Sequence, residues 1–218
     1  MEKQLLIFDL DGTLAETRED LTTSINLMRA HYALPPVDVE TVISHIGSGV
    51  RELIEGCVQG MDVDVDVDEA LALYKAFYAE HMLDETRLYP GVEEGLMTLS
   101  GHELAVLSNK PGDPARAILK HLGVGDLFFR MLGGGDLPNL KPAPDGIEAL
   151  MAESGIDMEN TWMIGDHHTD LEVAHNAGVK SGFVTYGLGH PGEFTADQTW
   201  HGFEELVEFF AGYGMRGA

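Results

Sequence analysis

The chain has 218 residues, 44% of them hydrophobic, which is enough to form the core of one α/β domain or of a domain with an insertion. Its formal net charge of -24 argues against a nucleic-acid partner bound through a basic face and against binding to an anionic membrane. No apolar run approaches the roughly 20 residues of a membrane-spanning helix. No signal peptide is expected, and Cys57 is the only cysteine, which excludes an intrachain disulfide and favours a cytoplasmic protein.

The first predicted element is a strand at residues 5–8, whose sequence Leu-Leu-Ile-Phe is apolar throughout. Such a run is typical of a strand buried on both faces of a parallel sheet. Asp9, Asp11 and Gly12 follow it closely. Because ligands bind at the carboxyl ends of the strands in an open parallel sheet, the two carboxylates occupy a position suited to catalysis. A plain Asp-Gly turn is the alternative interpretation.

Residues 15–87 show helical patterns and no convincing strand. Helices are predicted at residues 17–33, 38–45, 50–58 and 69–83. Residues 60–68 alternate valine with aspartate, but the like charges favour a solvated loop over a strand. The glycine and glutamate spacing of an EF-hand is absent there, so no calcium site is expected.

After residues 88–91, Leu-Tyr-Pro-Gly, strands and helices alternate. Strands are predicted at residues 103–107, 129–132, 161–164 and 182–186, and helices at residues 92–99, 114–122, 145–153, 171–176 and 203–210. Alternation at this spacing indicates βαβ units and a parallel sheet. The predicted fold is α/β, with a Rossmann-like parallel sheet in residues 1–15 and 88–218 and an all-helical insert, residues 16–87, after the first strand.

Ser108, Asn109 and Lys110 follow the strand predicted at residues 103–107. A hydroxyl group and backbone N–H groups at the start of a helix can hold phosphate oxygens, although a polar turn without a ligand is the alternative. Lys141 lies in a proline-containing loop, where a solvated surface lysine is the alternative to a functional one.

Two more carboxylates, Asp166 and Asp170, come after the strand predicted at residues 161–164. Together with a carboxylate from the first strand they suit a hard divalent cation. The alternative is a polar loop in which Asp170 caps the following helix. Each signal is weak by itself, but their combination at one edge of a sheet indicates an active site.

Taken together, four segments resemble the motifs of the haloacid dehalogenase superfamily. They are Asp9 to Thr13, Ser108 to Lys110, Lys141 to Pro144, and Gly165 to Asp170. The chain is similar to the phosphatase branch that carries a helical cap after the first strand, and the resemblance runs through nearly the whole chain. Residues 46–53, Ile-Gly-Ser-Gly-Val-Arg-Glu-Leu, resemble the cap of the phosphoglycolate phosphatase type.

This resemblance implies catalytic roles for side chains at the strand ends. Asp9 would be the nucleophile that forms an aspartyl-phosphate. Asp11 would protonate the leaving alkoxide and then activate water. Ser108 and the Asn109 amide would hold the phosphoryl oxygens, and Lys141 would neutralise negative charge.

The resemblance also implies Mg²⁺ as the cofactor. Its ligands would be Asp9, the backbone carbonyl of Asp11, and Asp166, with Asp170 binding the ion or orienting another ligand.

Two histidines depart from the family's pattern. His167 and His168 follow Asp166, where relatives usually carry a small hydroxyl residue first. The two are interpreted either as loop surface or as residues that alter the metal preference.

The cap is expected to select the substrate through Gly47, Gly49 and Arg51. The glycines break a helical pattern and allow close approach of backbone N–H groups to a substrate oxygen. Arg51 could pair with a substrate carboxylate, as phosphoglycolate supplies. The alternative is that the glycines only make a turn between helices and that Arg51 is solvated.

The favoured function is hydrolysis of a small phosphate ester, with phosphoglycolate as the favoured substrate, by a monomer or homodimer. A β-phosphoglucomutase-like mutase or a sugar-phosphate phosphatase of the same superfamily is the alternative. A dehalogenase is disfavoured, because that chemistry does not use an acid at the position of Asp11. A non-catalytic binding protein is disfavoured, because every catalytic position is filled.

Overall fold

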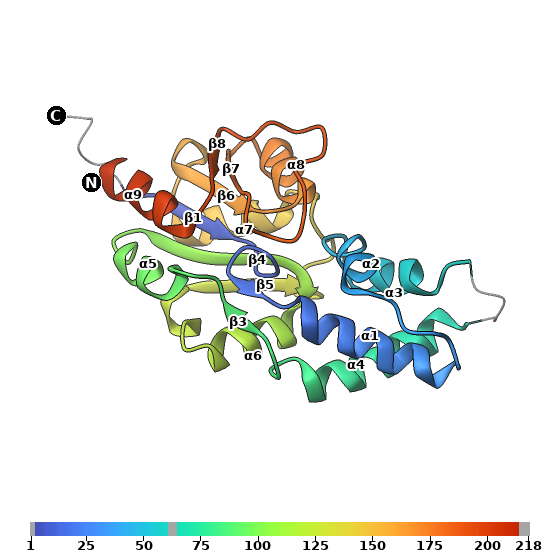
Figure 1. Ribbon diagram of the computed structural model, residues 1–218. Helices are drawn as coiled ribbons and strands as arrows, with labels where there is room; N and C mark the ends of the chain where they lie inside the picture. The colour runs from blue at the N-terminus through green and yellow to red at the C-terminus, as the bar shows by residue number, and fades with distance from the viewer. Residues whose placement is uncertain (1–2, 61–64, 214–218) are drawn as a thin grey trace.

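A six-stranded parallel sheet forms the centre of the protein, whose computed structural model describes residues 3–60 and 65–213 (Figure 1). The strands are β1 (Leu5–Phe8), β4 (Glu103–Pro111), β5 (Arg130–Gly134), β6 (Thr161–Gly165), β7 (Lys180–Val184) and β8 (Gln198–Trp200), in the order β5-β4-β1-β6-β7-β8. Every pair is parallel, and β1 lies between β4 and β6. The carboxyl ends of β1, β4 and β6 therefore meet at one edge of the sheet.

Helices cover both faces of the sheet, as the sequence predicts. They are α5 (Val92–Thr98), α6 (Gly112–His121), α7 (Asp145–Ser154), α8 (His168–Ala177) and α9 (Phe203–Tyr213). Because successive side chains of a strand point to opposite faces, Leu5 and Ile7 pack in one apolar cluster with α7 and α8, whereas Leu6 and Phe8 pack in another with α5, α6 and α9. All four side chains are fully buried, and for this reason every residue of β1 is apolar.

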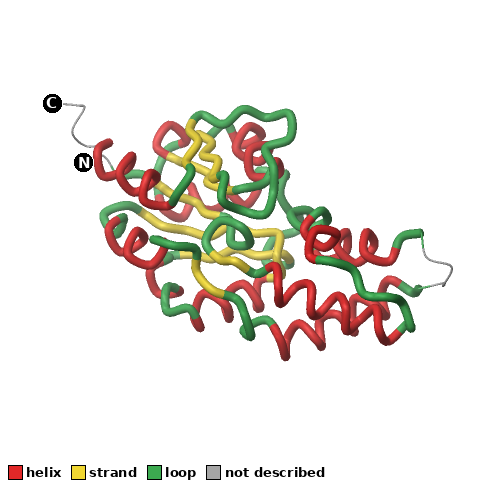
Figure 2. The backbone as a smooth tube through the Cα atoms, viewed as in Figure 1, coloured by secondary structure: helices red, strands yellow, loops and turns green. Residues whose placement is uncertain are grey.

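The helices of the insert that the sequence predicts at residues 16–87 lie at one end of the sheet (Figure 1). It contains α1 (Arg18–His31), α2 (Val39–Ile43), α3 (Val50–Val58) and α4 (Val67–His81), which Figure 2 shows as helices. The two connections to the sheet run side by side, because β2 (Ala15–Glu16) and β3 (Arg87–Leu88) form a short antiparallel pair. The buried carboxylate of Asp20 ties them further by accepting hydrogen bonds from the backbone N–H groups of Glu85 and Thr86, the latter at 2.9 Å.

The structure corrects several predicted boundaries. Helix α4 begins at Val67, inside the segment expected to be a loop, because the Asp66 side chain accepts a hydrogen bond from the backbone of Asp68 at 2.9 Å and caps the helix. Residues 61–64 of that segment lie outside the described part of the chain. The strands β2, β3 and β8 were not expected, since two or three residues carry too little periodic pattern to predict a strand. Among the described residues, no helix is long and apolar enough to span a membrane.

Candidate active site

Asp9 is the residue that follows the central strand, and its backbone continues that strand. Its N–H group donates a hydrogen bond to the carbonyl oxygen of Ile164 in β6 at 2.9 Å. The chain then turns at Gly12, whose φ of +87° is one that glycine adopts without strain. A Cβ atom at Gly12 would lie only 2.1 Å from the Asp166 carboxylate, so that both backbone conformation and space require glycine there.

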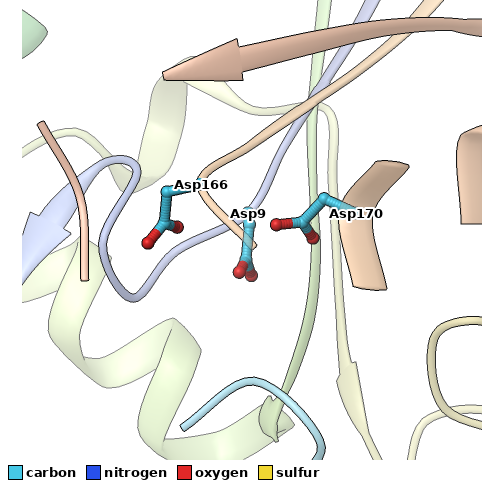
Figure 3. Close-up of side chains that lie close together, drawn as sticks. All are labelled: Asp9, Asp166 and Asp170. Atoms are coloured by element: carbon cyan, nitrogen blue, oxygen red, sulfur yellow. The ribbon is translucent and has the colours of Figure 1, made fainter. Parts of the chain in front are cut away.

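The carboxylates of Asp9, Asp166 and Asp170 meet at this edge of the sheet. One oxygen from each lies within 4.8 Å of the others, and all three residues are buried. Figure 3 shows the three side chains next to one another, with Asp9 between the other two in that view. The sequence predicts that these three carboxylates meet, because Asp9 and Asp166 each follow a strand and Asp170 lies four residues after Asp166.

Backbone and hydroxyl donors hold Asp166 in place. Its Oδ1 accepts a hydrogen bond from the Thr13 hydroxyl at 2.9 Å. Its Oδ2 accepts from the backbone N–H groups of Leu188 and Gly189, at 2.8 and 2.9 Å. The Asp170 carboxylate accepts from the backbone N–H of His167 at 3.0 Å. These bonds keep two carboxylates close together in a buried site.

Lys141 lies between two of the three carboxylates. Its Nζ is 3.0 Å from Oδ1 of Asp9 and 2.6 Å from Oδ1 of Asp170, and its side chain is 1% exposed. Burial alone would lower the pKa of Lys141, yet the charges of Asp170 and Asp9 raise it above its usual value. The lysine is therefore a permanent ammonium group beside the nucleophile expected at Asp9, and the surface-lysine alternative is ruled out.

One ammonium group does not balance three carboxylates. Burial, followed by repulsion from neighbouring carboxylates, raises the pKa of Asp166 to about 7. Burial also raises the pKa of Asp9 to about 6, although Lys141 opposes this shift. Three buried carboxylates next to each other suit a hard divalent cation, which would relieve their mutual repulsion. This cluster could hold a metal ion.

Ser108, Asn109 and Lys110 lie within β4, where its register with β5 shifts between Leu107 and Pro111. Such an irregularity changes the direction of side chains at a strand end. Ser108 is 4% exposed, and its hydrogen bond to Asp9 acts to lower the pKa of that carboxyl. The sequence predicts these three residues after the strand, whereas the structure places them inside the strand, near its carboxyl end.

The Asn109 side chain connects two loops beside the site. Its Oδ1 accepts a hydrogen bond from the backbone N–H of Lys141 at 2.7 Å, and its Nδ2 donates to the carbonyl oxygens of Lys141 and Gly47, each at 2.9 Å. The side-chain amide is thus used to position protein groups.

Lys110 is a functional candidate to which the sequence assigned no role. Its Nζ donates to both carboxylate oxygens of Asp11, at 2.9 and 3.1 Å. The Thr17 hydroxyl donates to the same carboxylate at 2.7 Å. The only local signal for Lys110 is its position next to Asn109, because its partner lies 99 residues away in the chain.

A cavity of about 630 Å³ extends from these residues toward the helical insert. Asp9, Asp11 and Asp166 are among its lining residues, and the insert contributes a largely apolar wall. That wall includes Ile46, Val50, Leu53, Tyr74 and Tyr78. The space is large enough for a small organic molecule between the sheet edge and the helices.

Of the three residues expected to select the substrate, two line this cavity and one does not. Gly47 and Gly49 line it, and both have φ values near +110°. Arg51 is absent from the lining, its side chain is 52% exposed, and it pairs with Asp68 and with Glu55, the latter at 3.7 Å. The structure therefore brings the glycines to the site and leaves Arg51 at the surface.

The sequence and the fold of this chain are similar to those of known hydrolases. The family model of haloacid dehalogenase-like hydrolases matches residues 6–184. The chain belongs to the haloacid dehalogenase-like hydrolase family. It is 35% identical to "Phosphoglycolate phosphatase 1" of Pseudomonas aeruginosa over 195 residues, covering 86% of this chain and 71% of that protein. It is 36% identical to "Phosphoglycolate phosphatase" of Neisseria meningitidis serogroup A, covering 85% of this chain and 82% of that protein.

Solved structures agree with this assignment. A crystal structure described as a predicted phosphoglycolate phosphatase from Haemophilus somnus superimposes with a TM-score of 0.90 at 30% sequence identity. The match covers 96% of this chain and 99% of that one. The α/β fold expected from the resemblance to this hydrolase family is thereby confirmed.

His167 lies where the insert meets the sheet domain. A Cβ atom at Gly47 would lie 2.6 Å from its imidazole ring, so the ring contacts the backbone of the insert. The His168 ring packs beside it with centroids 4.0 Å apart. Burial, together with His168, lowers the pKa of His167 to about 4, so this imidazole is neutral near pH 7. The loop-surface interpretation does not hold for His167, which is partly buried and lines the cavity.

Proposed function

We propose that this protein is a phosphatase that hydrolyses a small phosphate monoester through an aspartyl-phosphate, and that phosphoglycolate is its favoured substrate. The observation that carries the proposal is the buried Asp9 carboxylate at the end of the central strand, paired with Lys141 at 3.0 Å. A buried carboxylate held by an ammonium group is fixed in position, as a nucleophile must be. Relatives of about 35% identity that carry the name phosphoglycolate phosphatase support the choice of substrate.

Two transfers of the phosphoryl group complete the proposed reaction. A carboxylate oxygen of Asp9 attacks phosphorus, the bond from phosphorus to the ester oxygen breaks, and Asp11 gives its proton to the departing alkoxide. Asp11 then takes a proton from water, whose oxygen attacks the phosphorus of the aspartyl-phosphate. The bond to Asp9 breaks, inorganic phosphate leaves, and Asp9 is regenerated.

Several groups of this chain stabilise the charge that accumulates during the transfer. Lys141 opposes the negative charge on Asp9 and on the phosphoryl oxygens. Ser108 lies against Asp9 at the end of β4 and can donate its hydroxyl proton to a phosphoryl oxygen. The Asn109 side chain holds the Lys141 loop, so that the ammonium group stays beside the nucleophile.

We propose that the residues that hold Mg²⁺ are Asp9, Asp166, Asp170 and the backbone carbonyl of Asp11. The buried oxygen donors fit a hard divalent cation, as argued above. The ion would neutralise charge on the phosphoryl oxygens. Asp166 is held in place by hydrogen bonds from the Thr13 hydroxyl and from two backbone N–H groups, and such outer partners fix the orientation of a metal ligand.

The helical insert, residues 16–87, is proposed to be a cap domain over a core made of residues 1–15 and 88–218. Gly47 and Gly49 of the insert line the same cavity as Asp9 and Asp11, which supports a role in substrate choice. The paired connections β2 and β3 are where such a cap would hinge.

Phosphate release from a panel of metabolites tests the function. The panel contains 2-phosphoglycolate, hexose phosphates and an aryl phosphate, each with Mg²⁺ and with excess chelator. We expect phosphate release to require Mg²⁺ and to be most efficient with 2-phosphoglycolate. Conversion of β-glucose 1-phosphate to glucose 6-phosphate without net phosphate release would instead establish a mutase and overturn the proposal.

A further inference from the structure

We propose that Lys110 binds the second anionic group of the substrate, a carboxylate on the carbon next to the ester oxygen. The inference rests on the proposed phosphatase function and deepens it by naming the residue that distinguishes a phosphorylated hydroxy acid from other phosphate esters. It assigns to Lys110 the recognition that the sequence expected of Arg51.

The reaction itself limits where such a carboxylate can lie. To protonate the leaving group, Asp11 must come within about 2.6–3.2 Å of the ester oxygen. In phosphoglycolate one CH₂ group separates that oxygen from the carboxylate. The residue that reads the carboxylate must therefore lie close to Asp11. Lys110 meets this condition, because its Nζ is 2.9 Å from the Asp11 carboxylate.

The surroundings of Lys110 suit the recognition of an anion. Its side chain is 3% exposed, it lines the cavity, and its Nζ lies 4.7 Å from the centre of the Tyr78 ring. An ammonium group has three N–H donors, and the two oxygens of Asp11 occupy two of them. The third donor is available for a ligand, at a place where water screens the attraction only weakly.

The other basic side chains near the cavity fit the role less well. Lys141 forms ion pairs with Asp9 and Asp170, and Asp9 is the residue to which the phosphoryl group is proposed to be transferred. Arg116 lines the cavity but pairs with Asp136 at 2.6 Å and with Asp113 at 2.9 Å. Lys75 also lines the cavity but is exposed, so that its attraction for a carboxylate is weakened by water.

The net charge of -24 makes a buried cation more important for this choice of substrate. The chain as a whole repels an anionic ligand, and the three carboxylates of the site add to the repulsion. A substrate with both a phosphate and a carboxylate therefore needs a compensating charge on each side. Lys141 supplies one next to Asp9, and Lys110 supplies the other next to Asp11.

The test compares two substrates that differ in the carboxylate alone: 2-phosphoglycolate, and 2-hydroxyethyl phosphate, in which CH₂OH replaces it. Lys110→Met removes the charge at similar size, and Lys110→Gln keeps an N–H donor for Asp11 without the charge. We expect each variant to reduce the ratio of kcat/KM for 2-phosphoglycolate over 2-hydroxyethyl phosphate by about 10- to 100-fold, the range of a hydrogen bond to a charged group. The control Lys75→Met should change this ratio less than about twofold.

A purely structural role of Lys110 gives a different result. If Lys110 only positions Asp11, kcat/KM falls equally for both substrates, the ratio stays constant, and the inference is overturned. A changed ratio in Lys75→Met with a constant ratio in Lys110→Met would likewise assign the carboxylate to Lys75 and overturn it.

Binding separates this inference from the proposed function. In Asp9→Asn, which is expected not to turn over, calorimetry gives Kd for the same two esters with Lys110 intact and with Lys110→Met. A loss of affinity confined to 2-phosphoglycolate supports the inference even if the wild-type protein releases no phosphate. Equal affinities in both backgrounds contradict it, whereas absence of phosphate release by the wild type contradicts the proposed function alone.

Discussion

The Nδ2 atom of Asn109 donates a hydrogen bond to the carbonyl oxygen of Gly47 at 2.9 Å. This bond joins the end of strand β4 to the helical insert directly beside the cavity. The same side chain also makes two hydrogen bonds to the backbone of Lys141, at 2.7 and 2.9 Å. One buried amide therefore positions both the lysine next to Asp9 and the insert residue that covers the site.

Asn109→Ala should weaken both the fold and the proposed activity. The substitution leaves the backbone N–H of Lys141 without its acceptor, so we expect the free energy of unfolding to fall by about 1–3 kcal/mol. We also expect kcat/KM to fall for every substrate, because Lys141 loses its support. Urea denaturation and phosphate release measure the two effects. As a control, Asn139→Ala removes an exposed hydrogen bond to Asp145 and should change stability by less than about 0.5 kcal/mol.

Asp9→Asn should abolish phosphatase activity and leave the protein folded. An amide is a poor nucleophile, and Asn is close in size to Asp at this buried position. Phosphate release gives the rate, and circular dichroism checks the fold. Freshly purified variant with substantial activity, and with no deamidation by mass spectrometry, would contradict the role of Asp9.

The stabilisation of the protein by Mg²⁺ should increase with pH. Burial raises the pKa of Asp166 from 3.8 to about 7, so its contribution to stability in metal-free protein is fully present below 3.8 and is lost as pH rises through about 7. Mg²⁺ binds the ionised form and competes with this proton. The rise in Tm caused by the same Mg²⁺ concentration should therefore be small near about pH 5 and reach a plateau near about pH 8. Asp166→Asn should reduce this pH dependence to the part that Asp9 contributes, since the pKa of Asp9 is also raised, to about 6. An equal rise in Tm at both pH values in the wild type would refute the explanation.

Gly47→Ala should impair the site more than a comparable glycine substitution elsewhere. Its φ is +112°, and an added Cβ atom would lie 2.6 Å from the His167 ring. Gly155 also has a positive φ, +71°, but an added Cβ atom there meets no atom within 4 Å. We expect Gly155→Ala to cost stability alone, about 1 kcal/mol, whereas Gly47→Ala also raises KM. Adding His167→Ala to Gly47→Ala should restore part of the lost affinity, because the second substitution removes the collision but not the backbone strain. An unchanged KM in Gly47→Ala would show that the contact between Gly47 and His167 does not shape the site.

Local sequence patterns were sufficient for the parts of this protein that depend on neighbouring residues. The apolar run at residues 5–8 predicts β1 because a central parallel strand must be apolar on both faces. The positions of Asp9 and Asp166 follow from the strand ends before them, because parallel strands bring their carboxyl ends to one edge.

Only the tertiary structure decided how the polar side chains pair. Lys110 contacts Asp11 across 99 residues of chain, and Asn109 contacts Gly47 across 62. Arg51 was expected at the substrate, but Asp68, near the start of α4, lies where it can pair with this arginine at the surface. A charged side chain binds whichever opposite charge folding brings within a few ångströms, and sequence spacing carries no information about that distance. The sequence thus determined at which edge of the sheet the aspartates gather, and the tertiary structure determined which lysines pair with them.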